Sequence, residues 1–376
     1  MRILHTEWSD GFGGQERRVL AEAHALIRRG HYACIVCREH ARIREEARKK
    51  DIDTYTLPLR SNYDLVSIWK LCQFIKGQHF DVVNTHSGKD SWIGGIAARM
   101  AKTPVLVRTR HLDIRLKRNI VNFIHYLPDT YITCGLNMRD NLIKNCGFPP
   151  ERVVSIPTGI DERFLDTPRQ PQARTEYDLD ANAVVISNVG ILRTVKGQEV
   201  TLQAFKRVLE ALPHARCLLV GDGPGRNRLE NVAKTLGISE HVIFTGYVED
   251  VARIYSFSDV CVLSSFSEGV PQSVLQAMAV GVPVVATRVG GVPEVVVHEE
   301  TGLLVDSGDH EAIAAQILRL VNDPALVIKL TKNARTFVLK DHCLEAMVSK
   351  IEHLYMTLLQ RKTGNQNEDS IYPKDL

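Results

Sequence analysis

Short apolar runs alternate with segments of helical spacing along almost the whole chain, and no other feature restricts the fold as strongly. In the first half the strand-like runs are MRILHT, HYACIVC, DTYTLPL, FDVVNTH, PVLVRTR, TYITC and RVVSIPTG. Segments such as residues 16–29 and 92–101 lie between them and have apolar residues at helical spacing. A second series begins at Ala183 with AVVISNVG and continues through RCLLVG, HVIFTG, DVCVLSS and PVVATR. Strands that alternate with helices predict parallel sheets, so we expect an α/β protein.

The length and composition of the chain predict two globular domains. A chain of 376 residues with 44% hydrophobic and 24% charged residues can bury two cores. Residues 166–182 are polar and contain prolines, as is typical of a linker. We therefore expect an N-terminal domain over 1–165, a C-terminal domain over 183–340, a helix over 341–362 and a tail over 363–376. No apolar run reaches the length of a membrane span and no signal-peptide core is present, so the expected location is the cytoplasm.

The cysteines indicate the redox compartment of the protein, and the distribution of charge indicates the kind of partner it binds. Eight scattered cysteines fit a reducing compartment, and Cys34 and Cys37 are interpreted as thiols of a buried strand. Residues 1–165 contain 26 Lys and Arg against 18 Asp and Glu, so the net charge of +3 is unevenly distributed. This basic first half indicates an anionic partner, either a lipid-phosphate acceptor or an anionic membrane surface; a merely solvated basic face is the alternative. No nucleic-acid partner is expected.

Residues 264–294 contain the pattern that says most about chemistry. The serine-rich turn SSFSEG precedes a segment of helical spacing over 272–280, a short apolar run at 283–286 and a Gly-Gly pair. A turn that leads into a helix start offers backbone N–H groups to an anion. One carboxylate, that of Glu268, lies at this turn.

This segment resembles the donor-binding signature of family 4, the retaining, nucleotide-sugar-dependent glycosyltransferases of the GT-B fold. Glu268 matches the first Glu of that signature, and Gln276 occupies the position of its second Glu. The resemblance implies two Rossmann-like, doubly wound domains that face each other across a cleft, with the helix over 341–362 crossing back to the first domain. It also implies transfer of a sugar, with retention, from a nucleotide-diphosphate sugar to a glycan or lipid-linked acceptor in surface polysaccharide or lipopolysaccharide biosynthesis. A UDP-sugar is the expected donor, and GDP-mannose and an ADP-sugar remain open.

A second matching segment is VGILRTVKGQ, residues 189–198. Arg193 and Lys196 follow a predicted strand, where two cations suit the binding of a diphosphate. Lys196 matches a Lys-Gly of the family, whereas Ile191 stands where the family has Arg. The catalytic residues expected from residues and resemblance are His111, Arg193, Lys196 and Glu268. The residues expected to bind the donor or its nucleotide are Gly13, Gly14, Val248, Gly269, Val270, Gln272, Ser273 and Gln276.

The acceptor or membrane is expected to contact another set of first-half residues. These are Glu16, His86, Arg115, Lys117 and Arg118. Several assignments have an open alternative: Val248 as an ordinary loop residue, His86 as a structural or exposed histidine, and Gln276 as part of a polar helix face. The glycine-rich GDGPGR at 221–226 is interpreted as a structural turn, because it lacks the spacing of a dinucleotide fingerprint.

No metal and no cofactor are expected. The pairs Asp51-Ile-Asp53 and Asp178-Leu-Asp180 lie far along the chain from the donor signature. Without a dedicated carboxylate base, the departing diphosphate is expected to take the acceptor proton.

Two other functions remain open: a GT-B nucleotide-sugar epimerase, and a non-catalytic nucleotide-sugar-binding subunit, which Gln276 and Ile191 favour. The inner face of the plasma membrane is a further expected location, through peripheral binding.

Overall fold

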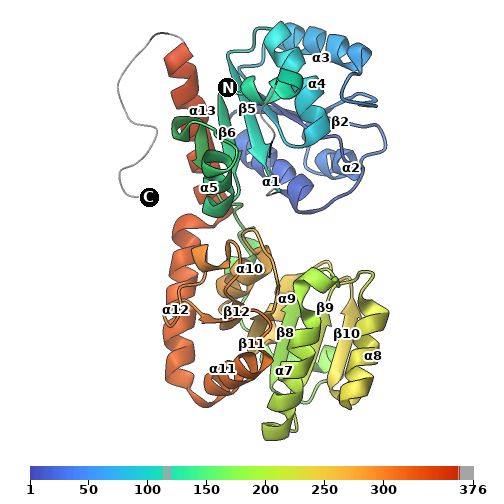
Figure 1. Ribbon diagram of the computed structural model, residues 1–376, viewed down its shortest axis with the longest axis vertical. Helices are drawn as coiled ribbons and strands as arrows, with labels where there is room; N and C mark the ends of the chain where they lie inside the picture. Colours follow the sequence, from blue (N-terminus) through green and yellow to red (C-terminus); the bar gives the residue numbers. More distant parts are fainter. Residues whose placement is uncertain (113–115, 117–119, 363, 365–376) are drawn as a thin grey trace. The chain divides into compact units, whose positions relative to one another are not determined.

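The chain folds into two compact units, each built around one parallel sheet (Figure 1). The computed structural model describes residues 1–112, 116, 120–362 and 364. Unit 1 comprises Met1–Gly159 and the segment from Leu344 onward, and unit 2 comprises Ile160–Cys343. The predicted α/β class with two Rossmann-like domains is confirmed. Arg115, Lys117, Arg118 and all of the expected tail except Gly364 lie outside the described residues.

The sheet of unit 1 has seven strands in the order β3-β2-β1-β4-β5-β6-β7. Its strands are β1 (Arg2–Thr6), β2 (Tyr32–Cys37), β3 (Asp53–Thr56), β4 (Val82–Thr85), β5 (Val105–Arg110), β6 (Thr130–Thr133) and β7 (Val153–Ser155). Ile3 pairs with Ala33 on one side and with Val82 on the other, so β1 lies between β2 and β4. The strands are apolar runs because helices cover both faces of the sheet. The strand order reverses at β1 and β4, where ligands of such sheets bind at the carboxyl ends.

The helical segments of unit 1 connect these strands and close the sheet. They are α1 (Gly14–Arg28), α2 (Arg42–Arg48), α3 (Leu65–Gln78), α4 (Gly88–Met100), η1 (Ile120–Tyr126), α5 (Leu136–Lys144), η2 (Pro150–Arg152) and α13 (Leu344–Lys362). The C-terminal helix α13 packs Met347, Ile351 and Tyr355 into the same apolar cluster as residues of β1, β4 and β5. Arg29 anchors it further through ion pairs with Glu345 and Glu352. The last helix among the described residues is therefore part of the first unit.

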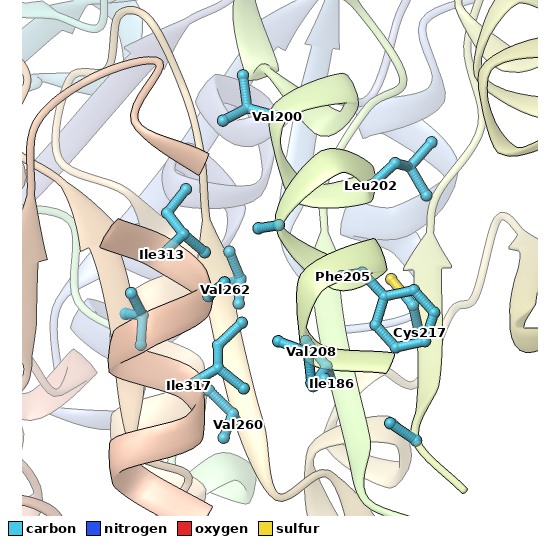
Figure 2. Close-up of a cluster of buried hydrophobic side chains, with 14 of the residues drawn as sticks. Ile186, Val200, Leu202, Phe205, Val208, Cys217, Val260, Val262, Ile313 and Ile317 are labelled. Carbon is cyan, nitrogen blue, oxygen red and sulfur yellow. The ribbon is translucent and has the colours of Figure 1, made fainter. Parts of the chain in front are cut away.

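The sheet of unit 2 repeats this topology with six strands in the order β10-β9-β8-β11-β12-β13. Its strands are β8 (Val185–Val189), β9 (Arg216–Val220), β10 (Val242–Gly246), β11 (Val260–Leu263), β12 (Val284–Thr287) and β13 (Leu303–Val305). Its helical segments are α6 (Arg163–Asp166), η3 (Pro171–Tyr177), η4 (Thr194–Lys196), α7 (Gln198–Ala211), α8 (Arg226–Leu236), η5 (Ser239–His241), α9 (Val251–Phe257), α10 (Gln272–Val280), η6 (Val292–Glu294), α11 (His310–Asn322) and α12 (Pro324–Asp341). Figure 2 shows the main core of this unit, in which Phe205 of α7 and Ile313 of α11 cover Ile186 and Val262 of the sheet.

Three features differ from the sequence-based expectations. The boundary between the units falls between Gly159 and Ile160, and the segment expected as a linker packs within unit 2 instead. Leu179 is buried there, and the Arg174 guanidinium pairs with Asp259 at 2.7 Å. Strand β13 was not expected, because three residues carry no periodicity. The helix expected over 341–362 begins at Leu344, after α12 has ended at Asp341.

Two further observations concern cysteines and membrane spans. All eight cysteines are free and buried, and burial raises the pKa of both Cys34 and Cys37 to about 12. These two are therefore inert thiols of strand β2, as interpreted. None of the described helices combines the length and the apolar content that crossing a bilayer requires.

Candidate active site

Two residues that lie far apart in the sequence meet at the strand-order reversal of unit 2. Strands β8 and β11 are neighbours, and the loops after them contain Lys196 and Glu268. The Lys196 ammonium donates to both carboxylate oxygens of Glu268, at 2.7 and 2.9 Å. Ser265 Oγ also donates to Glu268 Oε1, at 2.5 Å. Glu268 is nearly buried, with 8% of its side chain exposed, whereas Lys196 is 28% exposed and remains accessible to a ligand.

Glycines bring the two loops close enough for this pairing. Gly197 has φ +62° and a Cβ there would lie 2.0 Å from the carbonyl oxygen of Ser264. Gly290 has φ +50° and a Cβ there would lie 1.9 Å from the carbonyl oxygen of Glu268. Both positions therefore require glycine, for the left-handed backbone and for the close approach. Gly290 is part of the Gly-Gly pair of the sequence signature, so its role is to support the backbone of Glu268.

The glycine-rich turn at 221–226 positions the loop that contains Arg193. Leu192 N donates to Asp222 O at 3.0 Å, and Gly225 N donates to Leu192 O at 2.8 Å. A Cβ at Gly221 would lie 2.1 Å from the carbonyl oxygen of Gly190. These contacts support the interpretation of this motif as a structural turn. Arg193 is exposed on the loop, three residues before Lys196.

The remaining donor-side candidates of unit 2 lie around the start of α10. Gly269 and Val270 precede this helix, and Gln272, Ser273 and Gln276 are half-buried within its first turns. The hydroxyl of Tyr255 donates to Ser273 O at 2.8 Å and ties this turn to α9. Val248, the remaining candidate, is partly buried and packs against the apolar cluster of Leu218 and Phe257.

Unit 1 contains a chain of three histidines that extends from the ends of the central strands into the core. His86 and His111 follow β4 and β5, and His5 lies within β1. His5 Nδ1 is 3.0 Å from His86 Nε2, and His86 Nδ1 is 3.1 Å from His111 Nε2. At the inner end, His5 Nε2 lies 4.0 Å from Glu22 Oε1, which also accepts a hydrogen bond from Tyr355 at 3.0 Å.

Burial keeps these imidazoles neutral and thereby couples their tautomers. It lowers the pKa of His5, His86 and His111, and the charge of Arg18 lowers the last two further. A neutral imidazole has one N–H, so each ring donates with one nitrogen and accepts with the other. The tautomer of any one ring therefore fixes the donor and acceptor roles of the other two.

This chain leads to a prediction for the stability of unit 1. Because the folded-state pKa values are lowered, the unfolded chain binds protons below pH 6.5, the ordinary histidine value, that the folded unit does not bind. The free energy of unfolding should therefore fall as the pH drops from about 6.5 to 5, by up to about 1.4 kcal/mol per pH unit for each histidine. Urea unfolding followed by tryptophan fluorescence measures this, since Trp8, Trp69 and Trp92 are the three tryptophans of the chain and all lie in unit 1.

Comparing two variants with wild type separates the contribution of the buried histidines to this pH dependence from that of other groups. His86→Gln should show a smaller slope of unfolding free energy against pH, and the exposed His40→Gln should keep the wild-type slope. Burial and the nearby Asp90 raise the pKa of Glu7 to about 8, so Glu7 contributes the opposite slope between its ordinary value of 4.5 and that pH. Wild type, His86→Gln and His40→Gln all share this contribution of Glu7, so it cancels when their slopes are compared. Equal slopes for wild type and His86→Gln would contradict the assignment.

A cavity of about 450 Å³ opens beside the outer end of the histidine chain. His86 and His111 line it together with Lys89, Arg108 and Arg110, three cations that sequence reasoning missed. The signal was present, because these residues flank the two histidines in NTHSGK and RTRH. The structure thus brings the expected His86 and His111 together and surrounds them with positive charge.

The other described first-half candidates lie at the start of α1, where their neighbour Gln15 lines this cavity. Gly13 and Gly14 form the start of α1, where Glu16 Oε2 accepts from Gly13 N at 2.7 Å. Glu16 is buried, so its carboxylate serves as the N-terminal cap of this helix. Arg115, Lys117 and Arg118, as noted, are not among the described residues.

Two Rossmann-like units are the architecture of GT-B glycosyltransferases, and the second unit has a Lys–Glu pair at its strand-order reversal. Comparison with known families gives the same assignment. Residues 12–164 match the family "Glycosyltransferase Family 4", and residues 169–337 match "Glycosyl transferases group 1". Together these two glycosyltransferase models match most of the chain, which is therefore a glycosyltransferase.

Known relatives are distant in sequence but similar over most of their length. The chain is 28% identical to N-acetyl-α-D-glucosaminyl L-malate synthase of Bacillus anthracis, over 82% of this chain and 83% of the relative. It is 26% identical to the UDP-Gal:α-D-GlcNAc-diphosphoundecaprenol α-1,3-galactosyltransferase of Escherichia coli, over 96% and 98%.

Solved structures with the same fold include two that cover nearly the whole chain. A glycosyltransferase from Rickettsia africae has a TM-score of 0.86 at 22% identity, over 96% of this chain and 98% of that one. Anabaena Alr3699/HepE, solved in complex with UDP, has a TM-score of 0.84 at 21% identity, over 95% and 100%. At these identities the likeness establishes the fold.

Proposed function

We propose that this glycosyltransferase moves a sugar, with retention of anomeric configuration, from a UDP-sugar to a glycan or lipid-linked acceptor. The setting is surface polysaccharide or lipopolysaccharide biosynthesis, with peripheral binding to the inner face of the plasma membrane. The names of two relatives support a nucleotide-linked donor and a lipid-linked acceptor: HepE was solved with UDP, and the E. coli enzyme is named for UDP-Gal and a diphosphoundecaprenol acceptor.

The Lys196–Glu268 pair is the observation that carries this proposal. Transfer requires one group that neutralises the leaving diphosphate and another that holds the sugar hydroxyls. Lys196 supplies a partly exposed cation and Glu268 a nearly buried acceptor, at adjacent positions after β8 and β11. Arg193 on the same loop supplies a second cation. The proposed contact of His111 with the donor sugar rests on the resemblance alone.

The proposed reaction uses few protein groups. The bond between the anomeric carbon and the diphosphate oxygen breaks, and the diphosphate takes up the bond electrons. Lys196 and Arg193 stabilise the charge that develops there. The acceptor oxygen bonds to the anomeric carbon on the face that the diphosphate leaves, and the acceptor proton passes to the diphosphate. Retention follows from this same-face attack.

A panel of nucleotide sugars tests the function. UDP-sugars, GDP-mannose and ADP-sugars are compared by thermal shift, because a bound ligand raises the apparent stability. Release of nucleoside diphosphate is then measured with and without acceptor. Acceptor-dependent release of UDP supports the proposal. Turnover of the donor alone to its epimer identifies an epimerase instead, and binding without any turnover identifies a non-catalytic subunit.

Activity is predicted to survive removal of divalent cations. Lys196 and Arg193 are proposed to neutralise the diphosphate, a task that a metal ion would otherwise perform. Within the described residues, no group of three or more His, Cys, Asp or Glu side chains is placed to hold a metal ion. An assay with and without EDTA measures the effect, and added magnesium or manganese is the control. Complete loss in EDTA that either metal restores would overturn this part of the proposal.

A further inference from the structure

The cavity of unit 1 has a concentration of positive charge that the proposed donor chemistry does not use. Lys89, Arg108 and Arg110 all line it, and no Asp or Glu is found among its described lining residues. Lys89 Nζ lies 3.9 Å from the ring centroid of Trp8, so its ammonium is held in place at the wall. Three cations around one cavity of this size fit a doubly charged phosphate better than a single carboxylate.

Arg108 places a nearly buried cation at the wall of this cavity. Its side chain is only 2% exposed, and its Nη1 pairs with His125 Nδ1 at 2.9 Å. In the described part of the chain, its Nε has no hydrogen-bond partner. The buried Asp90 carboxylate is already bonded to His86 N, at 2.8 Å, and to Thr6 Oγ1, at 2.9 Å. The nearly buried Arg108 guanidinium acts on Asp90 and also lines the cavity, where its charge favours an anionic ligand.

An exposed apolar surface adjoins the cavity. We call Tyr63, Leu65, Val66 and Trp69 the α3 patch; their exposed fractions are 67%, 74%, 62% and 59%. The patch is continuous with the cavity, because the Tyr63 ring lies 5.3 Å from that of Trp92, which lines the cavity. Four large apolar side chains exposed together indicate a binding surface for an apolar ligand.

We propose that the cavity binds a phosphate group of the acceptor and that the α3 patch binds the apolar chain attached to that phosphate. This inference rests on the proposed function and narrows its acceptor to a lipid phosphate. Charge complementarity selects the phosphate, and the contact through Trp92 places the chain beside it. A soluble glycan would leave the patch without a ligand, and a neutral lipid would leave the three cations of the cavity without one.

Binding of geranyl phosphate to the full chain tests the site directly. Its affinity is measured by titration calorimetry and compared with those of inorganic phosphate and geraniol, which each present one half of the ligand. We expect geranyl phosphate to bind at least about tenfold more tightly than either, since both parts contribute. Geranyl phosphate that binds no more tightly than inorganic phosphate would overturn the proposal.

Two variants separate the two halves of the site. Lys89→Gln should weaken both geranyl phosphate and inorganic phosphate about tenfold, because a charged hydrogen bond is lost. Trp69→Ser should weaken geranyl phosphate several-fold and leave inorganic phosphate unchanged. Arg108→Gln, if it folds, should repeat the Lys89→Gln result. Lys76→Gln, an exposed lysine near the other end of α3, is the matched control and should bind both ligands as wild type does.

Vesicle binding tests whether the α3 patch contacts a bilayer instead, and UDP titration tests the proposed donor separately. Association with anionic vesicles that persists in Lys89→Gln and is lost in Trp69→Ser would assign the patch to the bilayer surface and overturn the acceptor site. UDP binding is measured in the same proteins and should not change in any variant. Normal geranyl phosphate binding without UDP binding would contradict the proposed donor and leave the phosphate site supported.

Discussion

Lys196→Ala is expected to reduce sugar transfer about a hundredfold while the protein remains folded. Its ammonium is the cation bonded to Glu268, and it is proposed to stabilise the leaving diphosphate. Loss of one preorganised group that stabilises transition-state charge costs about 3 kcal/mol, which corresponds to roughly a hundredfold in rate. Steady-state assays with saturating donor give the turnover number. Circular dichroism shows whether the fold is retained.

The matched control is Lys206→Ala, which removes an exposed lysine on α7 of the same unit. It should turn over as wild type does. Glu268 adds a second check, because Lys196→Ala leaves this carboxylate without its charge partner. Combining Lys196→Ala with Glu268→Gln should give a loss smaller than the sum of the two single losses, as contacting residues do. A folded Lys196→Ala protein with near-normal turnover would refute the assignment of Lys196.

Gly290→Ala should damage the site almost as severely, although Gly290 has no functional group. The added Cβ would lie 1.9 Å from Glu268 O, so the backbone of Glu268 must move. The left-handed φ of +50° adds strain of about 1–2 kcal/mol for any residue with a Cβ. We expect transfer to fall about a hundredfold, because displacement of Glu268 also disturbs Lys196. Calorimetry should show unit 2 melting several degrees lower.

Gly281→Ala is a control that separates the effect of backbone strain from the effect of the steric clash at Gly290. Gly281 also has a left-handed backbone, with φ +83°, but a Cβ there meets no heavy atom within 4 Å. This variant should lose stability through strain and keep its activity. If both variants lose activity equally, backbone strain alone explains the effect, and the close approach of Gly290 to Glu268 has no special role.

Local sequence determined much of the fold. The strand-like runs of both halves became strands, because continuous apolar segments bounded by turns form strands buried on both faces. Helix α10 spans Gln272–Val280, as its apolar spacing and the following Gly281 and Pro283 predicted. The turn at 221–226 was also interpreted correctly as structural. In each case the deciding interactions are short-range, so a few neighbouring residues contain the signal.

Other features depended on partners far along the chain. Residues 166–182 are polar enough for a linker, but Leu179 is buried and Arg174 pairs with Asp259, and neither contact has a local signature. Strand β13 is too short to show a period, and it forms because Val285 and its neighbours offer it a free edge.

The chemical groupings were decided by tertiary structure alone. Sequence motifs singled out Lys196, Glu268, His86 and His111 one at a time, but they could not show the Lys196–Glu268 bond or the chain of histidines. Those contacts exist because the strand orders place β8 beside β11 and β4 beside β5, which brings the ends of neighbouring strands together. Sequence thus indicated individual candidate residues, and the sheet order determined which of them meet, because hydrogen bonds and burial act over a few ångströms and not along the chain.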